Sequence, residues 1–246
     1  MNKYRADLHI HTVLSPCGDL EMSPANIIEN AREKGLDIIG ITDHNTTRHC
    51  KLIRKLAEPA GIFVLMGAEV TTREEVHCLT FFENDDQLSE FQDYLEKHLP
   101  PIPNNTEKFG YQVVVDEDEQ IIDEIEFLLI SALDQSIKQV EEKVHSLGGI
   151  FIPAHIDRSS YSIISQLGFI PTDILIDGIE ISANCKLSSI LPFLGGQTER
   201  TIIRDSDAHF IENIGTSFSI FELEHRTFSE VKLALQRKQG RKVTIA

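Results

Sequence analysis

The chain has 246 residues, of which 41% are hydrophobic and 25% are charged, and its formal net charge is -16. This length can bury the core of one large α/β domain, and the composition is that of an ordinary globular protein. The negative charge argues against a protein that binds long nucleic acids non-specifically, because it would repel their phosphate backbone.

No run of eighteen apolar residues predicts a membrane span, and the N-terminal residues MNKYRADLHIH lack the apolar stretch of a secretory signal. The four cysteines are scattered along the chain: Cys17, Cys50, Cys78 and Cys185. They form no C-x-x-C pair, so they predict neither a disulfide framework nor a structural zinc site. Free thiols indicate a reducing compartment, and we expect a cytoplasmic protein without a membrane partner.

Eight short apolar runs rich in Ile, Val and Phe are expected to be strands. In chain order they cover residues 6–10, 36–42, 61–69, 75–82, 148–155, 177–182, 201–209 and 214–223. Helical periodicity lies between several of them, at 23–35, 49–61 and 136–149, and each of these segments closes on a glycine. Apolar strands that alternate with helices indicate a parallel sheet, and seven or eight such units predict a (β/α) barrel.

The alternation breaks between residues 83 and 135. The acidic segment 83–105 is expected to be a helix stopped by Pro100 and Pro101, and 110–124 a hairpin around the turn DEDEQ. We interpret 83–135 as an insertion or cap after the fourth strand, within a single domain of residues 1–246. The alternative is a long β/α connection with its own helix. The charges suit a solvated surface, whereas the position favours a cap that admits small phosphate esters.

Metal-binding side chains collect at the predicted strand ends, where barrel enzymes carry their chemistry. Alternate side chains of a strand point the same way, so His9 and His11 leave the first strand on one face. The other candidates lie in or after later runs: Asp43, His44, Glu69, His77, His155, Glu180, Asp205, Asp207 and His209. One such histidine would be an ordinary core residue. Many imidazoles and carboxylates without a cation would leave buried charge uncompensated, so we expect a metal centre.

The ligand types narrow the choice of metal. Because no thiolate-rich set occurs, the sequence argues against soft copper and iron–sulfur sites. Mixed imidazole and carboxylate ligands suit Zn, Mn or Fe. The candidates outnumber the ligands of one tetrahedral ion, so we expect two or three ions that share a carboxylate. Two ions roughly 3.5–4 Å apart form a clamp for phosphoryl transfer to water.

The chain resembles the PHP (polymerase and histidinol phosphatase) superfamily of metal-dependent phosphoesterases through DLHIHTVLSPCGDLEMSP, GITDHN, GAEV, EVHCL, PAH and SDAH, in this order. The resemblance covers most of the chain except 83–135 and is closest to the stand-alone phosphoesterases. It implies a distorted (β/α)7 TIM-like barrel. It also implies ligands, by motif: His9, His11, Glu69 and Asp207 for one ion, Glu69, His77 and His155 for a second, and Asp19, His44 and His209 for a third.

Several residues beside these ligands keep more than one interpretation. The segment SPCGD offers both Cys17 and Asp19, and we prefer the carboxylate because a thiolate would be unusual beside ions that bind phosphate. Asp205 is expected to support a ligand or cap a helix, and Cys17 to lie behind the ligands. Asp43 is expected to orient a ligand histidine or to contact its neighbour's backbone. Three roles remain open for Glu180: it supports a ligand, it binds a substrate hydroxyl, or it is purely structural.

The resemblance suggests a mechanism. A water bridging two ions, with Glu69 as the shared ligand, loses a proton and attacks phosphorus in line, while the ions neutralise the phosphoryl oxygens. Arg158 is the best placed arginine for the phosphate; Arg204 is weaker, since an ion pair in the barrel wall is its alternative role. The proton for the leaving oxygen comes from a metal-bound water, Asp43 or His209.

The leading functional hypothesis is hydrolysis of a small phosphomonoester, either a nucleotide or a metabolite phosphate. The alternatives are a 5'-3' exonuclease on short oligonucleotides, another metal hydrolase such as an amidohydrolase, and a non-catalytic regulatory barrel stabilised by metals. Amidohydrolases commonly carry a bridging lysine where this chain offers Glu69, which favours phosphoesters. The nearly complete ligand set argues against a non-catalytic barrel.

Overall fold

The computed structural model describes residues 1–194 and 200–245. The strands are β1 Asn2–Ile10, β2 Ile38–Ile41, β3 Phe63–Thr71, β4 His77–Phe82, β5 Val113–Val115, β6 Ile121–Glu124, β7 Ile150–Pro153, β8 Ile179–Ile181, β9 Ile202–Arg204, β10 Ser219–Leu223 and β11 Lys242–Ile245. The helices are α1 Pro24–Glu33, α2 Cys50–Ala57, α3 Asp85–His98, α4 Thr106–Phe109, α5 Ile137–Ser146, α6 Ile163–Leu167, α7 Leu187–Ile190 and α8 Phe228–Leu235, with 3-10 turns at Leu191–Phe193 and Ile211–Asn213.

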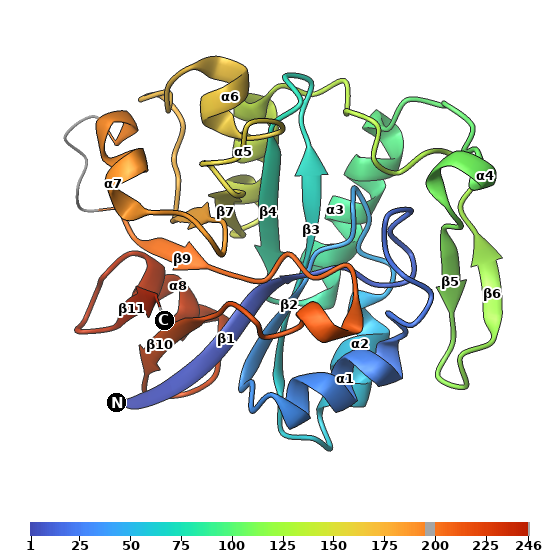
Figure 1. Ribbon diagram of the computed structural model, residues 1–246, viewed down its shortest axis with the longest axis horizontal. Helices are drawn as coiled ribbons and strands as arrows, with labels where there is room; N and C mark the ends of the chain where they lie inside the picture. The colour runs from blue at the N-terminus through green and yellow to red at the C-terminus, as the bar shows by residue number, and fades with distance from the viewer. Residues whose placement is uncertain (195–199, 246) are drawn as a thin grey trace.

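A curled seven-stranded sheet, in the order β11-β10-β1-β2-β3-β4-β7, forms the centre of the molecule (Figure 1). All eight predicted runs contain a strand, and β11 was not predicted. The expected parallel pairing is confirmed for β1, β2 and β3, but the sheet as a whole is mixed, because β4 is antiparallel to β3 and β10 is antiparallel to β1. Five residues separate β3 from β4. A parallel crossover needs a dozen or more residues, so a link this short permits only a hairpin.

Two further pairings position strands outside this sheet. Strands β8 and β9 form a parallel pair of their own. Asp177 N donates to Phe151 O, which places β8 beside β7. Ala208 N donates to His9 O and His11 N donates to Ala208 O, which places the segment after β9 beside the end of β1. These bonds bring the ends of early and late strands to one edge.

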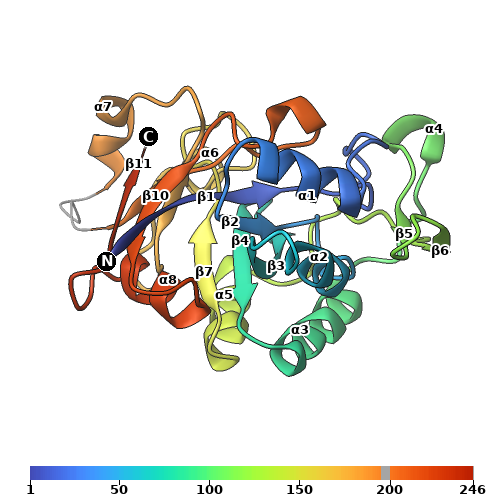
Figure 2. The same cartoon turned by 90° about the horizontal axis from the view of Figure 1, so that it is seen from below.

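The predicted long helices are present as α1, α2 and α5, and they lie outside the curved sheet (Figure 2). The side chain of Ser23 caps α1 ahead of Pro24, and Ser136 forms a capping box with Gln139 at α5. Successive residues of β2 pack into different core clusters, so this strand is buried on both faces. Among the described residues, no helix has both the length and the apolar character needed to cross a membrane.

Residues 83–135 consist of two different parts. As predicted, a helix ends before the prolines: α3 packs on β4, with the ring of Phe91 4.5 Å from that of Phe82. The predicted hairpin is β5–β6, which lies at the far right of Figure 1. Its Val113 and Val115 pack against Val13 in the loop after β1. The hairpin is therefore attached to a loop that follows two candidate ligands.

Candidate metal centre

The candidate ligands converge from six parts of the chain. His9 lies near the end of β1, and His11 follows that strand. The others lie after β2, in β3, at the start of β4, after β7 and after β9: His44, Glu69, His77, His155, Asp207 and His209. The reversed direction of β4 explains its contribution. Because β4 is antiparallel to β3, its first residue, His77, pairs with Thr71 at the end of β3 and so lies at the shared edge.

Glu69 is the centre of this arrangement. Its carboxylate is buried, and both of its oxygens face imidazole nitrogens. Oε1 lies 2.9 Å from His77 Nδ1, 3.1 Å from His155 Nε2 and 3.3 Å from His9 Nε2, and Oε2 lies 3.1 Å from His44 Nδ1 and 3.3 Å from His11 Nε2. Five imidazoles around one carboxylate suit a carboxylate that is shared between ions.

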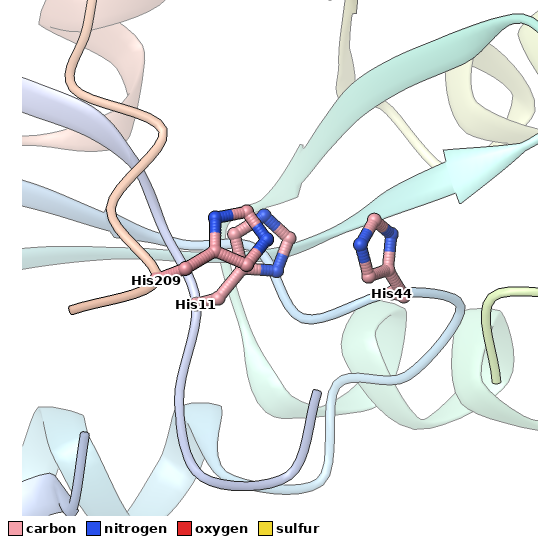
Figure 3. Close-up of side chains that lie close together, drawn as sticks. All are labelled: His11, His44 and His209. Atoms are coloured by element: carbon pink, nitrogen blue, oxygen red, sulfur yellow. The ribbon is translucent and has the colours of Figure 1, made fainter. Parts of the chain in front are cut away.

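The ligand atoms form three overlapping groups, each within 4.8 Å: His9, His11, Glu69 and Asp207; His44, Glu69 and His77; and His11, His44 and His209. Figure 3 shows the third group, in which the His209 ring stacks on that of His11 at 4.1 Å. Two ligands about 2.1 Å from a tetrahedral ion are about 3.4 Å apart. Within the first group, His9 Nε2 and His11 Nε2 lie 3.3 Å and 3.4 Å from Asp207 Oδ1.

These groups agree with the sequence-based ligand sets in part. The first group is the set implied by the resemblance. In the second, His44 takes the place of His155, which nevertheless contacts Glu69 Oε1, the oxygen that His77 also faces. In the third, His11 takes the place of Asp19. The Asp19 carboxylate instead accepts a hydrogen bond from Glu21 N at 2.8 Å, so its role as a ligand stays a prediction.

The donor set fits divalent cations. Within the described part of the chain, His44 Nδ1 and Asp207 Oδ1 are buried beside other ligand atoms and yet form no hydrogen bond with them. His155 Nδ1 has no hydrogen-bond partner there either, while Nε2 of the same ring faces Glu69. In addition, His9 Nε2 and His11 Nε2 face each other at 3.2 Å. Such orphaned atoms each cost about 1–3 kcal/mol. Imidazole and carboxylate lone pairs that converge in this way are satisfied by Zn, Mn or Fe ions.

Hydrogen bonds behind the ligands orient three imidazoles. Glu180 accepts from His9 Nδ1 at 2.9 Å and from His155 N at 2.8 Å. His11 Nδ1 lies 3.0 Å from Ser15 Oγ, and His209 Nδ1 lies 3.0 Å from the carbonyl oxygen of Asp207. A proton held at Nδ1 leaves Nε2 with a free lone pair, as a metal ligand requires. Of the roles left open for Glu180, these contacts favour the support of a candidate ligand, which stays a prediction.

Two further aspartates lie behind the ligands. Asp43 accepts from Thr12 N at 2.7 Å and from Ser15 Oγ at 2.7 Å, so it supports the partner of His11, as its predicted orienting role requires. These contacts lend no support to Asp43 as the proton donor. Asp205 Oδ1 accepts from Leu8 N at 2.8 Å, which suits the predicted supporting role. Burial, followed by the nearby carboxylate of Glu180, raises the pKa of Asp205 well above its usual value.

The two arginines that were predicted to bind phosphate have different surroundings. Arg158 Nη2 is 2.6 Å from Asp207 Oδ2, and its side chain is 46% exposed, so it stands at the mouth of the cluster. Arg204 Nη2 donates to the carbonyl oxygen of Cys185 at 3.0 Å, so its guanidinium contacts the loop after β8. Cys17 is exposed, and all four cysteines are free thiols, as expected.

Electrostatics divides the imidazoles into two kinds. Burial lowers the pKa of His9 and His11, but the carboxylates around them more than offset it, so the pKa of His9 lies well above the usual value and that of His11 at about 8. Burial dominates at His44 and His209. It holds the pKa of His44 well below the usual value and that of His209 at about 4. Cations must therefore displace protons from the first pair.

Two candidate ligands have an unusual backbone conformation. His155 has a φ of 28° and Asp207 a φ of 51°, although neither is a glycine. A left-handed conformation costs a non-glycine residue about 1–3 kcal/mol and persists only where the surroundings enforce it. Here the strain accompanies side chains directed at Glu69 and His9.

Sequence reasoning missed several residues around the centre. Thr12 and Ser15 lie within the quoted HTVLSP motif, but they received no role. His49 was assigned to a helix-like segment, yet it contacts Thr12 at 2.7 Å. The Tyr161 ring stacks on that of His77 at 4.7 Å, and its carbonyl accepts from His77 N. Only the motif that contains Thr12 and Ser15 gave a signal, because the other partners lie far apart in the chain.

Two curated proteins are similar in sequence to parts of this chain. The chain is 38% identical over 90 residues to the uncharacterized protein MJ1587 of Methanocaldococcus jannaschii, covering 33% of this chain and 52% of that protein. It is 31% identical over 78 residues to phosphoribosyl 1,2-cyclic phosphate 1,2-diphosphodiesterase of Eggerthella lenta, covering 30% of this chain and 29% of that protein.

The fold is similar to that of a solved structure. The lesion-specific endonuclease PfuEndoQ of Pyrococcus furiosus superposes with a TM-score of 0.69 at 22% identity, over 98% of this chain and 58% of that one. The chain thus spans less than two thirds of each of these three proteins. The model of the PHP domain matches residues 7–155. This match spans more than half of the chain and includes six of the clustered ligands, so the chain belongs to the PHP domain family of metal-dependent phosphoesterases.

Proposed function

We propose that the chain hydrolyses a small phosphomonoester, a nucleotide or a metabolite phosphate, at two or three divalent ions held around Glu69. The main support for this proposal is the buried Glu69 carboxylate, which faces five imidazole nitrogens at 2.9–3.3 Å. The three overlapping ligand groups support as many as three ions, and their donor types support Zn, Mn or Fe.

When bound, the ions supply Lewis acidity and a nucleophile derived from water. The chain supplies orientation and charge. Glu180 and Ser15 hold the protons of His9 and His11 at Nδ1. Arg158, half-exposed beside Asp207, presents a guanidinium that binds two phosphate oxygens. The low pKa of His209 keeps its imidazole neutral, which suits a ligand better than a proton donor.

The proposal includes a particular architecture. The bonds that place β8 beside β7, and the segment after β9 beside the end of β1, support a distorted seven-strand barrel that closes around the ligand edge. The domain would comprise residues 1–246, with the β5–β6 hairpin of 83–135 as a cap. The packing of Val113 and Val115 on Val13 supports the cap, because Val13 follows the ligand-bearing end of β1.

A second candidate is hydrolysis of a phosphodiester, such as a cyclic phosphate or the end of a short oligonucleotide. The similarity to a cyclic-phosphate diphosphodiesterase of Eggerthella lenta favours it. Endonuclease Q, whose fold the chain shares, has been crystallised with a 27-mer duplex substrate. Against a long polymer stand the net charge of -16 and the acidic hairpin turn at residues 116–119.

A substrate panel tests the proposal. Purified protein loaded with Zn²⁺ or Mn²⁺ would be offered a nucleoside 5'-phosphate, histidinol phosphate, a cyclic nucleotide and a labelled oligonucleotide. We expect the highest kcat/KM for a phosphomonoester, and its loss in Glu69→Gln. Preference for the cyclic nucleotide or the oligonucleotide would replace the first candidate by the second. Turnover that survives in both Glu69→Gln and His9→Ala would leave a non-catalytic metal centre.

A further inference from the structure

A chain of buried hydrogen bonds leads from the β5–β6 hairpin toward the metal centre. Val115 N donates to His49 Nε2 at 3.0 Å, and His49 Nδ1 lies 2.7 Å from Thr12 Oγ1. The first bond fixes the direction of the second. Because Nε2 accepts, the proton of the neutral ring is on Nδ1, and His49 donates to Thr12. Burial lowers the pKa of His49, which keeps the ring neutral and Nε2 available to the hairpin.

The chain of bonds continues from Thr12 to a candidate ligand. Thr12 Oγ1 donates to Asp43 Oδ2 at 2.8 Å, and Ser15 Oγ donates to Asp43 Oδ1 at 2.7 Å. Because the Ser15 hydroxyl proton is used in this way, Ser15 Oγ accepts from His11 Nδ1 at 3.0 Å. The proton on Nδ1 leaves His11 Nε2 free at the metal centre. Each donor in this series has one acceptor, so the links constrain one another.

We propose that His49 is a positioning residue that couples the β5–β6 hairpin to the metal centre, through Thr12, Asp43 and Ser15 to the ring of His11. A purely structural histidine would fill space beneath the hairpin and affect stability alone. The observed bonds require more, because one nitrogen holds the hairpin backbone and the other holds the network behind a ligand. Coupling is reciprocal, so metal loading should protect the hairpin, and loss of the link should weaken metal binding.

Three substitutions at His49 separate the two bonds. His49→Phe keeps a ring and removes both bonds. His49→Asn places an amide near the Nδ1 position and keeps the contact with Thr12. His49→Gln places an amide near the Nε2 position and keeps the contact with Val115. The measurements are Zn²⁺ affinity of the metal-free protein, by competition with a chromophoric chelator, and amide hydrogen exchange of Val115. Neither measurement requires a substrate. The inference rests on the proposed metal centre, and it can hold even where the proposed substrate is wrong.

We expect Zn²⁺ affinity to fall about tenfold in His49→Phe and His49→Gln and to be retained in His49→Asn. A loss of about tenfold is at the lower end of the range measured when a residue that orients a metal ligand is removed. Exchange of Val115 should accelerate in His49→Phe and His49→Asn and not in His49→Gln. Zn²⁺ should slow this exchange in the wild type and lose that effect in His49→Phe. The control is His98→Phe, which removes a histidine bonded to Asp134 outside the network and should change neither measurement.

Two results would overturn the proposal. One is a Zn²⁺ affinity of His49→Phe within twofold of the wild type. The other is the same pattern of losses in His49→Asn and His49→Gln, which would indicate general loosening. If His49→Phe does not fold, Thr12→Val tests the same link, since it removes the hydroxyl and nearly keeps the shape. It should weaken Zn²⁺ binding about tenfold, and unchanged affinity would also refute the coupling.

Discussion

Two clusters of histidine and carboxylate groups in this molecule look alike in composition and differ in how their atoms are satisfied. Around His145, Nδ1 contacts Glu141 Oε1 at 2.7 Å and Nε2 contacts Asp177 Oδ2 at 2.9 Å. The remaining carboxylate oxygens also have partners: Lys138 contacts Glu141, and Gln236 contacts Asp177. Every polar atom of this cluster is used within the protein.

Around Glu69 the opposite holds. Imidazole nitrogens face one another and one shared carboxylate, and buried atoms of His44, His155 and Asp207 have no hydrogen-bond partner in the described residues. The difference teaches that residue type does not distinguish a metal centre from a salt-bridge network. Ligand atoms that crowd within 4.8 Å of one another, without a hydrogen bond for each, do. The cluster around His145 is complete as it stands, whereas the cluster around Glu69 needs cations.

The strongest test exchanges one carboxylate for an amide in each cluster. Glu69→Gln should lower kcat/KM for phosphoesters by more than about 100-fold, because it removes the shared ligand. This loss exceeds the one expected when a residue that only orients a ligand is replaced. The matched variant Glu141→Gln should keep the activity and the metal content. Metal analysis and steady-state kinetics on both proteins check this expectation. Equal losses in the two variants would erase the distinction between the clusters.

A smaller effect is expected one step behind the ligands. Glu180→Gln keeps the size of the side chain but removes the charge that holds the proton of His9 at Nδ1. Zn²⁺ affinity should fall about 10–100-fold, as is typical for such partners. Isothermal titration of the metal-free protein measures it. An unchanged affinity would show that the backbone alone orients His9 and that Glu180 has no role in the centre.

Local patterns in the sequence predicted much of this centre. The alternation in HIH put His9 and His11 on one face, and the apolar runs marked the strand ends that carry Glu69 and His155. The order and direction of the strands in the sheet were harder to predict from the sequence. His77 was assigned to its strand, but its place at the ligand edge depends on the antiparallel turn between β3 and β4.

Long-range contacts account for what the sequence did not predict. His49 looks like one residue of an amphipathic helix, and its partners Thr12 and Val115 are 37 and 66 residues away. Asp19 fits the motif, yet its carboxylate caps a local turn. Such choices depend on which groups the fold brings within hydrogen-bond reach, and a short pattern carries no information on that.

A lower pH should weaken metal binding at the centre around Glu69. In the metal-free protein the pKa of His11 is about 8, so a cation must displace a proton below that pH. Zn²⁺ affinity should therefore fall about eightfold from pH 7.5 to 6.5 for this proton, against about twofold for a histidine with the usual pKa. The raised pKa of His9 adds to the drop. A change of twofold or less would contradict the protonated imidazoles.

The smallest expected effect concerns stability at the other cluster. Burial lowers the pKa of His145, but the carboxylates of Asp177 and Glu141 more than offset it, so the pKa is raised. A raised pKa in the folded state stabilises the protein fully below the unfolded value of about 6.5, and this contribution is lost as the pH rises through the folded value. His145→Gln should thus lower the free energy of unfolding by about 1–2 kcal/mol at pH 6 and by less at pH 9. Urea denaturation of metal-free wild type and variant measures the difference, in which the titration of His9 and His11 cancels. A loss of equal size at both pH values would mean that His145 is neutral, and that packing and neutral hydrogen bonds hold this cluster together.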